Sequence, residues 1–197
     1  MDTFIIVGEA YCGKEASAGS GARYNVDMIR VEQVLDSWRT IRQDTALAVE
    51  EFPAGELGFR PTPELATFRE IARHVLDASD GLIGLVLAGD EDLTSGNFRE
   101  RMKPHMRGLP ADAGAAELAA ALRESGAQLT AQLAERPAEF FAGMITRFDG
   151  QKVTRLEMVQ FIKEHELTHR SQLFMYLRLK GVVPATTRRR LAKQAGK

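Results

Sequence analysis

Apolar residues recur at steps of three and four along four long segments of the chain, and the alternation typical of strands is scarce. Such steps gather side chains on one face of a helix, which can then be buried against a neighbour. The first segment predicts a helix over residues 26–51. Its core-facing line consists of Met28, Val31, Leu35, Trp38, Ile41, Thr45 and Val49.

The second segment opens with helix-starting residues. Thr62 can cap a helix, Pro63 suits the first helical position and Glu64 suits the positive end of the helix dipole. We therefore expect a second helix from this point to about Ala88. A third helix is predicted over the alanine-rich residues 112–135, which end before an Arg-Pro pair.

The fourth segment has signals at both of its ends. Thr154 and Glu157 have the spacing of a capping box, and Val153 and Met158 have the spacing of a hydrophobic staple. Gly181 is a typical residue for the left-handed conformation that ends a helix. The pattern predicts a fourth helix between these signals.

The connections between the helices restrict the topology. About eleven residues join the first two helices, but a stretch of about twenty, GDEDLTSGNFRERMKPHMRGLP, separates the second from the third. A connection of that length can return along a whole bundle. We predict an all-α four-helix bundle with a long crossover between its second and third helices. A small hairpin is expected in FFAGMITRFDGQKVT, where Asp149-Gly150 is a turn signal.

The predicted organisation is an N-terminal extension over 1–25, the bundle over 26–184 and a basic C-terminal tail over 185–197, solvated and partly frayed.

In the extension, Gly8, Gly13 and Lys14 have the spacing of a phosphate-binding loop. Glu15, however, stands where a magnesium-binding Ser or Thr is needed, and no alternating strand and helix pattern follows. This disfavours a nucleotide site.

Composition narrows the class of protein. A chain of 197 residues with 44% hydrophobic content can bury a full core, so it needs neither a metal nor a disulfide to fold. Its single cysteine, Cys12, excludes an internal disulfide and a sulfur-rich zinc site. A net charge of -1 disfavours nucleic-acid binding. No apolar run approaches the length of a membrane span and no secretory signal is evident, so a cytoplasmic location is expected.

The stretch HELTH, residues 165–169, matches the H-E-x-x-H signature of zinc proteases. His165 and His169 are four residues apart and therefore lie on one helix face. This face is otherwise apolar, so both histidines are expected to point into the bundle. Zinc proteases of this type take their third ligand from downstream, whereas Gln172 and Met175 occupy the corresponding positions here and no histidine, aspartate or glutamate follows His169.

A third ligand must therefore come from upstream. His105 lies in a proline-flanked loop, where exposure is the ordinary expectation. His74 lies in the middle of the second helix, on the core-facing line of Ile71, Ala78 and Leu85. The metal ligands predicted on this basis are His74, His165 and His169. Three imidazoles form an open site that suits zinc and can also hold nickel or iron.

Two nearby residues have alternative interpretations. If the chain is a protease, Glu166 is its general base, and on this interpretation Glu166 is our tentative catalytic residue. Alternatively, it points about 100° away from His165 and pairs with Arg170, the interpretation that we favour. Tyr176 either lines the same site or packs in the core, and we favour packing.

The segments FRPTPELATFREIARHVLDAS and MVQFIKEHELTHRSQLFMYLRLKGVVP resemble the DinB superfamily of four-helix bundles. The resemblance rests on a histidine in the second helix and H-x-x-x-H-R-x-Q-L in the fourth, and it covers about residues 26–184. The matching residues are His74, His165, His169, Arg170, Gln172 and Leu173. Ser171 departs from the glycine that the family often has, and the N-terminal extension is also atypical.

The resemblance implies a divalent metal, commonly zinc or nickel, held by the three histidines, and often a homodimer. Members with assigned activity use a low-molecular-weight thiol such as mycothiol or bacillithiol, and others are described as metal-dependent hydrolases. Our leading hypothesis is an enzyme whose trihistidine site activates such a thiol, or water, towards a small electrophile. The alternatives are a non-catalytic metal-binding or protein-interaction bundle and, less favoured, a peptidase.

Overall fold

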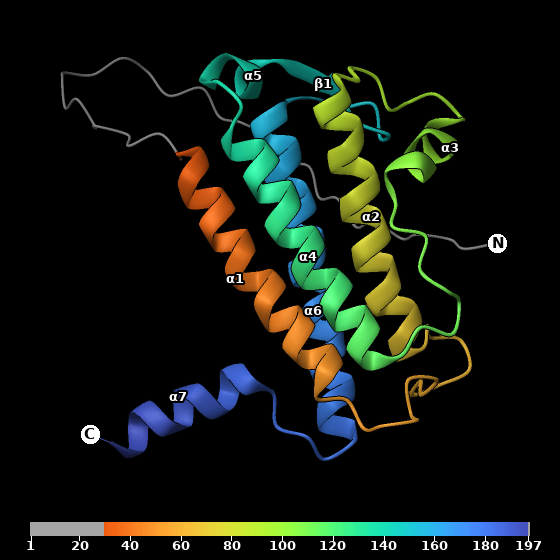
Figure 1. The fold of residues 1–197 in the computed structure, drawn as a ribbon, viewed down its shortest axis with the longest axis vertical. Coiled ribbons are helices and arrows are strands. Elements are labelled where there is room, and N and C mark those ends of the chain that lie inside the picture. The colour runs from red at the N-terminus through yellow and green to blue at the C-terminus, as the bar shows by residue number, and fades with distance from the viewer. Residues whose placement is uncertain (1–29, 197) are drawn as a thin grey trace, which may run out of the picture.

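The computed structural model describes residues 30–196, and four long helices form its body (Figure 1). These helices are α1 (Val31–Glu50), α2 (Phe68–Ala88), α4 (Ala115–Ala134) and α6 (Arg155–Leu179). The shorter elements are α3 (Phe98–Met102), η1 (Lys103–His105), α5 (Ala138–Ala142), β1 (Met144–Thr146), β2 (Lys152–Thr154) and α7 (Ala185–Ala195).

The long helices have two directions. α1 and α6 run one way along the bundle, and α2 and α4 run the other way (Figure 1). Each of α1 and α2 packs against both α4 and α6. Because α2 and α4 are parallel, residues 89–114 must return along the length of the bundle, and α3 and η1 lie in this connection. The predicted four-helix bundle with a long crossover is confirmed.

The start of α2 differs from the prediction. The helix begins at Phe68, and residues around Thr62 form a turn instead. Thr67 and Glu70 form a capping box, in which the Thr67 side chain accepts from the Glu70 amide and the Glu70 carboxylate accepts from the Thr67 amide. This arrangement satisfies two amides at once, which explains why the helix starts there. Its end at Ala88 is as predicted, with Gly89 at φ +88°.

The other predicted boundaries agree more closely with the structure. The third predicted helix corresponds to α4, and the predicted capping box of Thr154 and Glu157 begins α6. The predicted hairpin is present, with Ile145 opposite Val153 and Gly150 in the turn at φ +83°. The described part of the first helix starts at Val31. Residues 26–29, and the extension with its glycines and Lys14, lie outside the described residues.

The core is divided into two apolar clusters by a polar layer at mid-height. One cluster lies towards the C-terminal end of α1 and includes Phe68 and Leu173, and the other includes Trp38 and Met158. Between them, four polar side chains from all four long helices are buried: Arg42, Ser79, Ser125 and Glu166. Of the predicted ligand histidines, His165 directly precedes Glu166 of this layer on α6.

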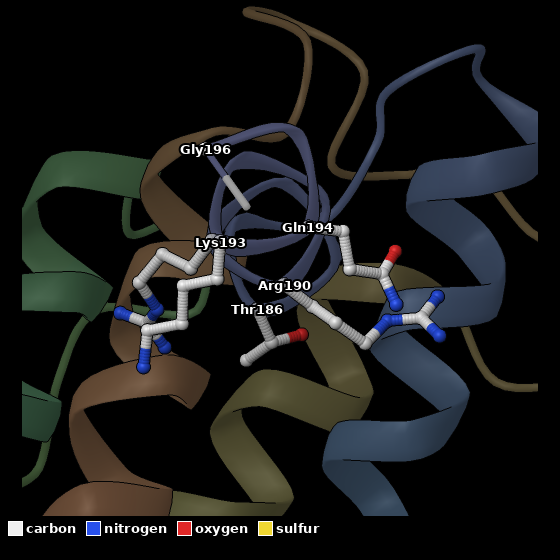
Figure 2. A pocket seen from close by; sticks show the side chains of 6 residues that line it. Thr186, Arg190, Lys193, Gln194 and Gly196 are labelled. Carbon is white, nitrogen blue, oxygen red and sulfur yellow. The ribbon is translucent and has the colours of Figure 1, made fainter.

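The C-terminal segment differs from the frayed tail that we expected. It forms α7, which projects from the end of the bundle (Figure 1) and has no buried residue. Arg188 pairs with Glu51, and Arg189 pairs with Asp44, so two ion pairs hold α7 against α1. A hollow beside α7 is lined by residues that include Arg189, Arg190 and Lys193, and by none of the four histidines (Figure 2). Within residues 30–196, no helix has the length and apolar character needed to cross a membrane.

Candidate metal centre

The structure brings three of the four histidines together between α2 and α6. Nε2 of His165 lies 3.0 Å from Nε2 of His74 and 3.1 Å from Nε2 of His169. His165 and His169 are one turn apart on α6, so they present their rings to the same side. All three side chains are half-buried, which leaves the cluster closer to the surface than the core position that the sequence predicted.

One hydrogen bond sets the tautomer of His169. Its Nδ1 lies 2.7 Å from Oε1 of Gln172, the next turn of α6. An Nδ1–H that donates to this oxygen leaves Nε2 with a free lone pair, directed at the other two histidines. Histidines that ligate metals commonly donate their second N–H in this way. Gln172 therefore orients a ring that is suited to metal binding.

Two of the three imidazoles are held in the neutral state. The pKa of His74 is lowered to about 4, chiefly by burial and then by the charges of His169 and Arg99. The pKa of His165 is lowered to about 3, again chiefly by burial and then by its two histidine neighbours. A neutral imidazole has the lone pair that a metal requires. Both side chains are thus in a ligand-competent state at neutral pH.

The donor set and its spacing fit a divalent transition metal. The three candidate ligand atoms lie within 4.8 Å of one another. A tetrahedral ion with metal–nitrogen bonds of 2.0–2.1 Å separates its ligand nitrogens by about 3.3–3.4 Å, so small adjustments of the rings would suffice. Three imidazoles suit zinc, nickel or iron better than magnesium or calcium, which prefer oxygen. A fourth coordination position would remain for water or substrate.

Glu166 is engaged inside the bundle and turned away from the role of a protease base. Its side chain is only 1% exposed, and its Oε2 accepts from Trp38 Nε1 at 2.7 Å and from Arg42 Nε at 3.0 Å. The predicted partner, Arg170, lies instead 3.4 Å from Asp44. The predicted pairing of Glu166 with Arg170 is therefore wrong. Arg42 forms the pair because it reaches Glu166 from the facing helix α1, which spacing along α6 does not reveal.

Tyr176 and His105 occupy the surroundings that we favoured for them. Tyr176 is buried between Phe59 and Phe68, and its hydroxyl donates to the Ala66 carbonyl at 2.9 Å. His105 is exposed in η1 and lies outside the cluster, with its ring against Gly84 of α2. Neither residue contributes to the site.

Sequence reasoning missed two charged residues, one on the helix of His74 and one that acts on His74 from α3. Asp77 is half-buried, three residues after His74 on α2, and burial raises the pKa of its carboxyl. Arg99, on α3, lies close enough for its charge to lower the pKa of His74. The spacing of Asp77 from His74 is a signal that could have found it, because residues three apart share a helix face. No local signal in the sequence places Arg99 there, since the crossover brings it.

An aromatic cluster joins α3, the β1–β2 turn and α6. Phe98 stacks on Phe148 with ring centroids 5.8 Å apart, and Phe148 packs edge-on against Phe161 at the same distance. Phe161 lies one turn before His165 on α6. The cluster therefore packs α3 and the β1–β2 turn against α6 one turn before His165, and α3 carries Arg99.

Comparisons with known proteins assign the family. The model of the DinB superfamily matches residues 37–173, which include all three clustered histidines. The chain belongs to the DinB superfamily, as the resemblance of its motifs predicted. No curated protein sequence matches it.

Solved structures share the fold at low sequence identity. YjoA, a DinB-like protein from Bacillus subtilis, is 18% identical with a TM-score of 0.59, over 76% of this chain and 92% of that one. YfiT from Bacillus subtilis, described as a probable metal-dependent hydrolase with an unusual four-helix bundle topology, is 16% identical with a TM-score of 0.61, over 83% and 94%. A mycothiol-dependent maleylpyruvate isomerase is 17% identical with a TM-score of 0.56, over 74% of this chain and 61% of that one.

Proposed function

We propose that this protein is a metal-dependent enzyme in which His74, His165 and His169 bind one divalent ion, zinc or nickel, that activates a low-molecular-weight thiol or water towards a small electrophile. The observation that carries the proposal is the convergence of three imidazole nitrogens from two helices, two of them on neutral rings. A domain of this size does not need a metal to fold, so the ligand set favours a functional role.

The ion would supply Lewis acidity that lowers the pKa of a bound water or thiol. The residues of the chain have distinct roles around it. The three histidines hold it, and Gln172 keeps the His169 ring in its ligating tautomer. Asp77, one turn from His74, is the carboxylate that we propose as proton acceptor, because residues three apart share a helix face and burial raises the pKa of its carboxyl. Arg99 is placed to attract an anionic substrate.

Two proteins of similar fold suggest different nucleophiles, one water and the other a thiol. YfiT is described as a probable metal-dependent hydrolase, which corresponds to activated water. The maleylpyruvate isomerase is described as mycothiol-dependent, which corresponds to activated thiol. A panel of small electrophiles, assayed with mycothiol, bacillithiol and no thiol, separates the two. Turnover that needs a thiol selects the transferase or isomerase chemistry, and turnover without one selects hydrolysis.

The metal itself is tested first. Protein purified without a nickel column should contain about one divalent ion per chain by elemental analysis, and His169→Ala should lose it. His105→Ala is the matched control, because this exposed histidine lies outside the cluster. A folded wild-type protein that neither retains nor binds a divalent ion would rule the proposal out.

The second candidate function is a non-catalytic metal-binding or protein-interaction bundle. It predicts stoichiometric metal without turnover of any substrate in the same panel. The peptidase hypothesis is weaker, because the carboxylate that would have to act as base is only 1% exposed and its Oε2 is bound by Trp38 and Arg42 inside the bundle. Peptide cleavage that Glu166→Gln abolishes even at saturating metal would restore it.

We further propose that the protein forms a homodimer and that it is located in the cytoplasm. Exposed apolar side chains at the C-terminal end of α6, Met175 and Leu179, offer a surface for a second copy. Light scattering at micromolar concentration should give twice the mass of 21.8 kDa. The double substitution Met175→Lys, Leu179→Lys should give the monomer, and retention of the dimer would place the interface elsewhere.

A further inference from the structure

The guanidinium of Arg42 lies at the centre of the bundle and contacts every other long helix. This α1 side chain is 2% exposed. It donates from Nε to Glu166 of α6 at 3.0 Å, from Nη2 to Ser79 of α2 at 2.7 Å, and from Nη1 to Ser125 of α4 at 3.3 Å. Trp38 adds a second donor to the same Glu166 oxygen. One side chain thus links all four helices at mid-height.

This network touches both ligand helices beside their ligands. Glu166 directly follows His165 on α6. On α2, the Ser79 hydroxyl donates to the carbonyl of Val75, the residue after His74. A rotation or shift of α6 relative to α1 would break the contact between Arg42 and Glu166, and it would also move His165 and His169 away from His74. The buried contacts and the histidine geometry therefore depend on the same helix register.

The packing around Arg42 is specialised for it. A Cβ at Gly126 of α4 would lie 2.5 Å from Cγ of Arg42, so this helix has a glycine where the side chain passes. Stability alone does not explain such an arrangement, because the desolvation of a buried ion pair offsets most of its attraction, and apolar replacements are often as stable. Buried polar pairs can instead select one helix register among several.

We propose that Arg42 and Glu166 are positioning residues, which hold α6 in the register that directs His165 and His169 at His74. This inference rests on the proposed metal site and assigns to Glu166 a role different from a catalytic base. It predicts that the pair contributes more to metal affinity and coordination geometry than to the stability of the metal-free bundle.

Cobalt binding to the full chain tests the inference. We would compare wild type with Glu166→Gln, which keeps the volume, and with the double variant Arg42→Met, Glu166→Met, which removes both charges. The readouts are the Co²⁺ dissociation constant, the visible absorption of bound Co²⁺, and the urea unfolding of the metal-free protein. We expect both variants to lose about 10- to 100-fold in affinity, as for other partners that orient ligands, with an altered cobalt spectrum.

Gly126→Ala perturbs the same pair from a helix that contributes no ligand. Its new methyl group would displace Arg42 while α2 and α6 remain unchanged in sequence, so Co²⁺ affinity should fall. Gly58→Ala is the matched control, because nothing lies within 4 Å of its added Cβ. Leu133→Ala, a cavity in the core at the far end of α4, controls for lost stability and should leave affinity unchanged.

The outcomes separate the inference from the proposed function. Wild-type affinity and an unaltered spectrum in both charge variants would overturn the positioning role alone. So would a loss of affinity in Leu133→Ala as large as theirs, because lost stability would then account for the effect. A wild-type protein that binds no Co²⁺ would overturn the proposed metal site and this inference with it.

Discussion

Nδ1 of His169 lies 2.7 Å from Oε1 of Gln172, one turn further along α6, and this bond leaves Nε2 free to face His74 and His165. Gln172→Ala removes the acceptor, so the His169 ring can rotate and change tautomer. We expect zinc affinity to fall by about 10- to 100-fold, measured by competition with a chromophoric chelator. Gln160→Ala, on the same helix, is the control and should bind zinc like wild type. Equal affinity in the two variants would contradict the orienting role of Gln172.

The stability of the metal-free protein should depend on pH through the histidines. The pKa values of His74 and His165 in the folded protein, about 4 and about 3, lie below the ordinary 6.5. Between these values and 6.5 the unfolded chain binds more protons than the folded one. The free energy of unfolding should therefore rise as the pH is raised from about 4 to about 6.5, and this contribution should be constant above that window.

Buried carboxyl groups change the free energy of unfolding with pH in the opposite direction. The variant His165→Gln separates the histidine effect from theirs. Burial raises the pKa of Asp80, so its contribution to stability decreases as pH rises through its titration. Urea unfolding of metal-free wild type and variant at several pH values gives a difference that contains the effects of residue 165 and of its contacts with His74 and His169. The wild-type curve should be steeper between pH 4 and 6.5. Parallel curves would show that His165 titrates normally in the folded protein.

The sequence predicted the bundle because its main signals are local. Helical periodicity, the capping box at Thr154 and the glycine after α6, Gly181, each depend on neighbouring residues only. The same locality explains the predicted trio of His74, His165 and His169, since helix spacing gives the direction of each side chain. The predicted start of α2 at Thr62 was wrong because a second set of helix-starting residues follows closely. Thr67 and Glu70 form the capping box that begins the helix.

The partners of Glu166 could not be predicted, because they depend on how separate helices face one another. Arg42 is 124 positions away in the sequence, and the line of apolar residues in α1 gave no reason to place a guanidinium in the core. Arg99 reaches the histidines through the path of the crossover. The ion pairs that hold α7 are of the same kind, since they join chain segments more than 130 residues apart. Contacts between distant segments are therefore what the structure adds.

The packing of the crossover against α2 depends on a glycine. A Cβ at Gly84 would lie 2.3 Å from Cγ and 2.4 Å from Cβ of His105. Gly84→Ala gains about 1 kcal/mol of helix propensity, but overpacking costs about 1–3 kcal/mol, so we expect a net loss of stability by chemical denaturation. Gly96→Ala, with open space around its added Cβ, should stay within about 0.5 kcal/mol of wild type. Increased stability of Gly84→Ala would show that η1 moves aside at little cost.

Asp77 lies three residues after His74 on α2 and is half-buried, and Arg73 and Asp80 are the charged groups that act on its carboxyl. In the proposed function this carboxylate accepts the proton of an activated water or thiol, and burial raises its pKa above the ordinary value. With a substrate identified by the electrophile panel, Asp77→Asn should lower kcat by about 100-fold or more. Metal content should remain at the wild-type level, because the three histidines are unchanged. Asp112→Asn, at an exposed position outside the long helices, is the control. Unchanged kcat in Asp77→Asn would show that the proton goes to solvent and not to Asp77. Loss of metal in this variant would show that Asp77 instead supports the position of His74.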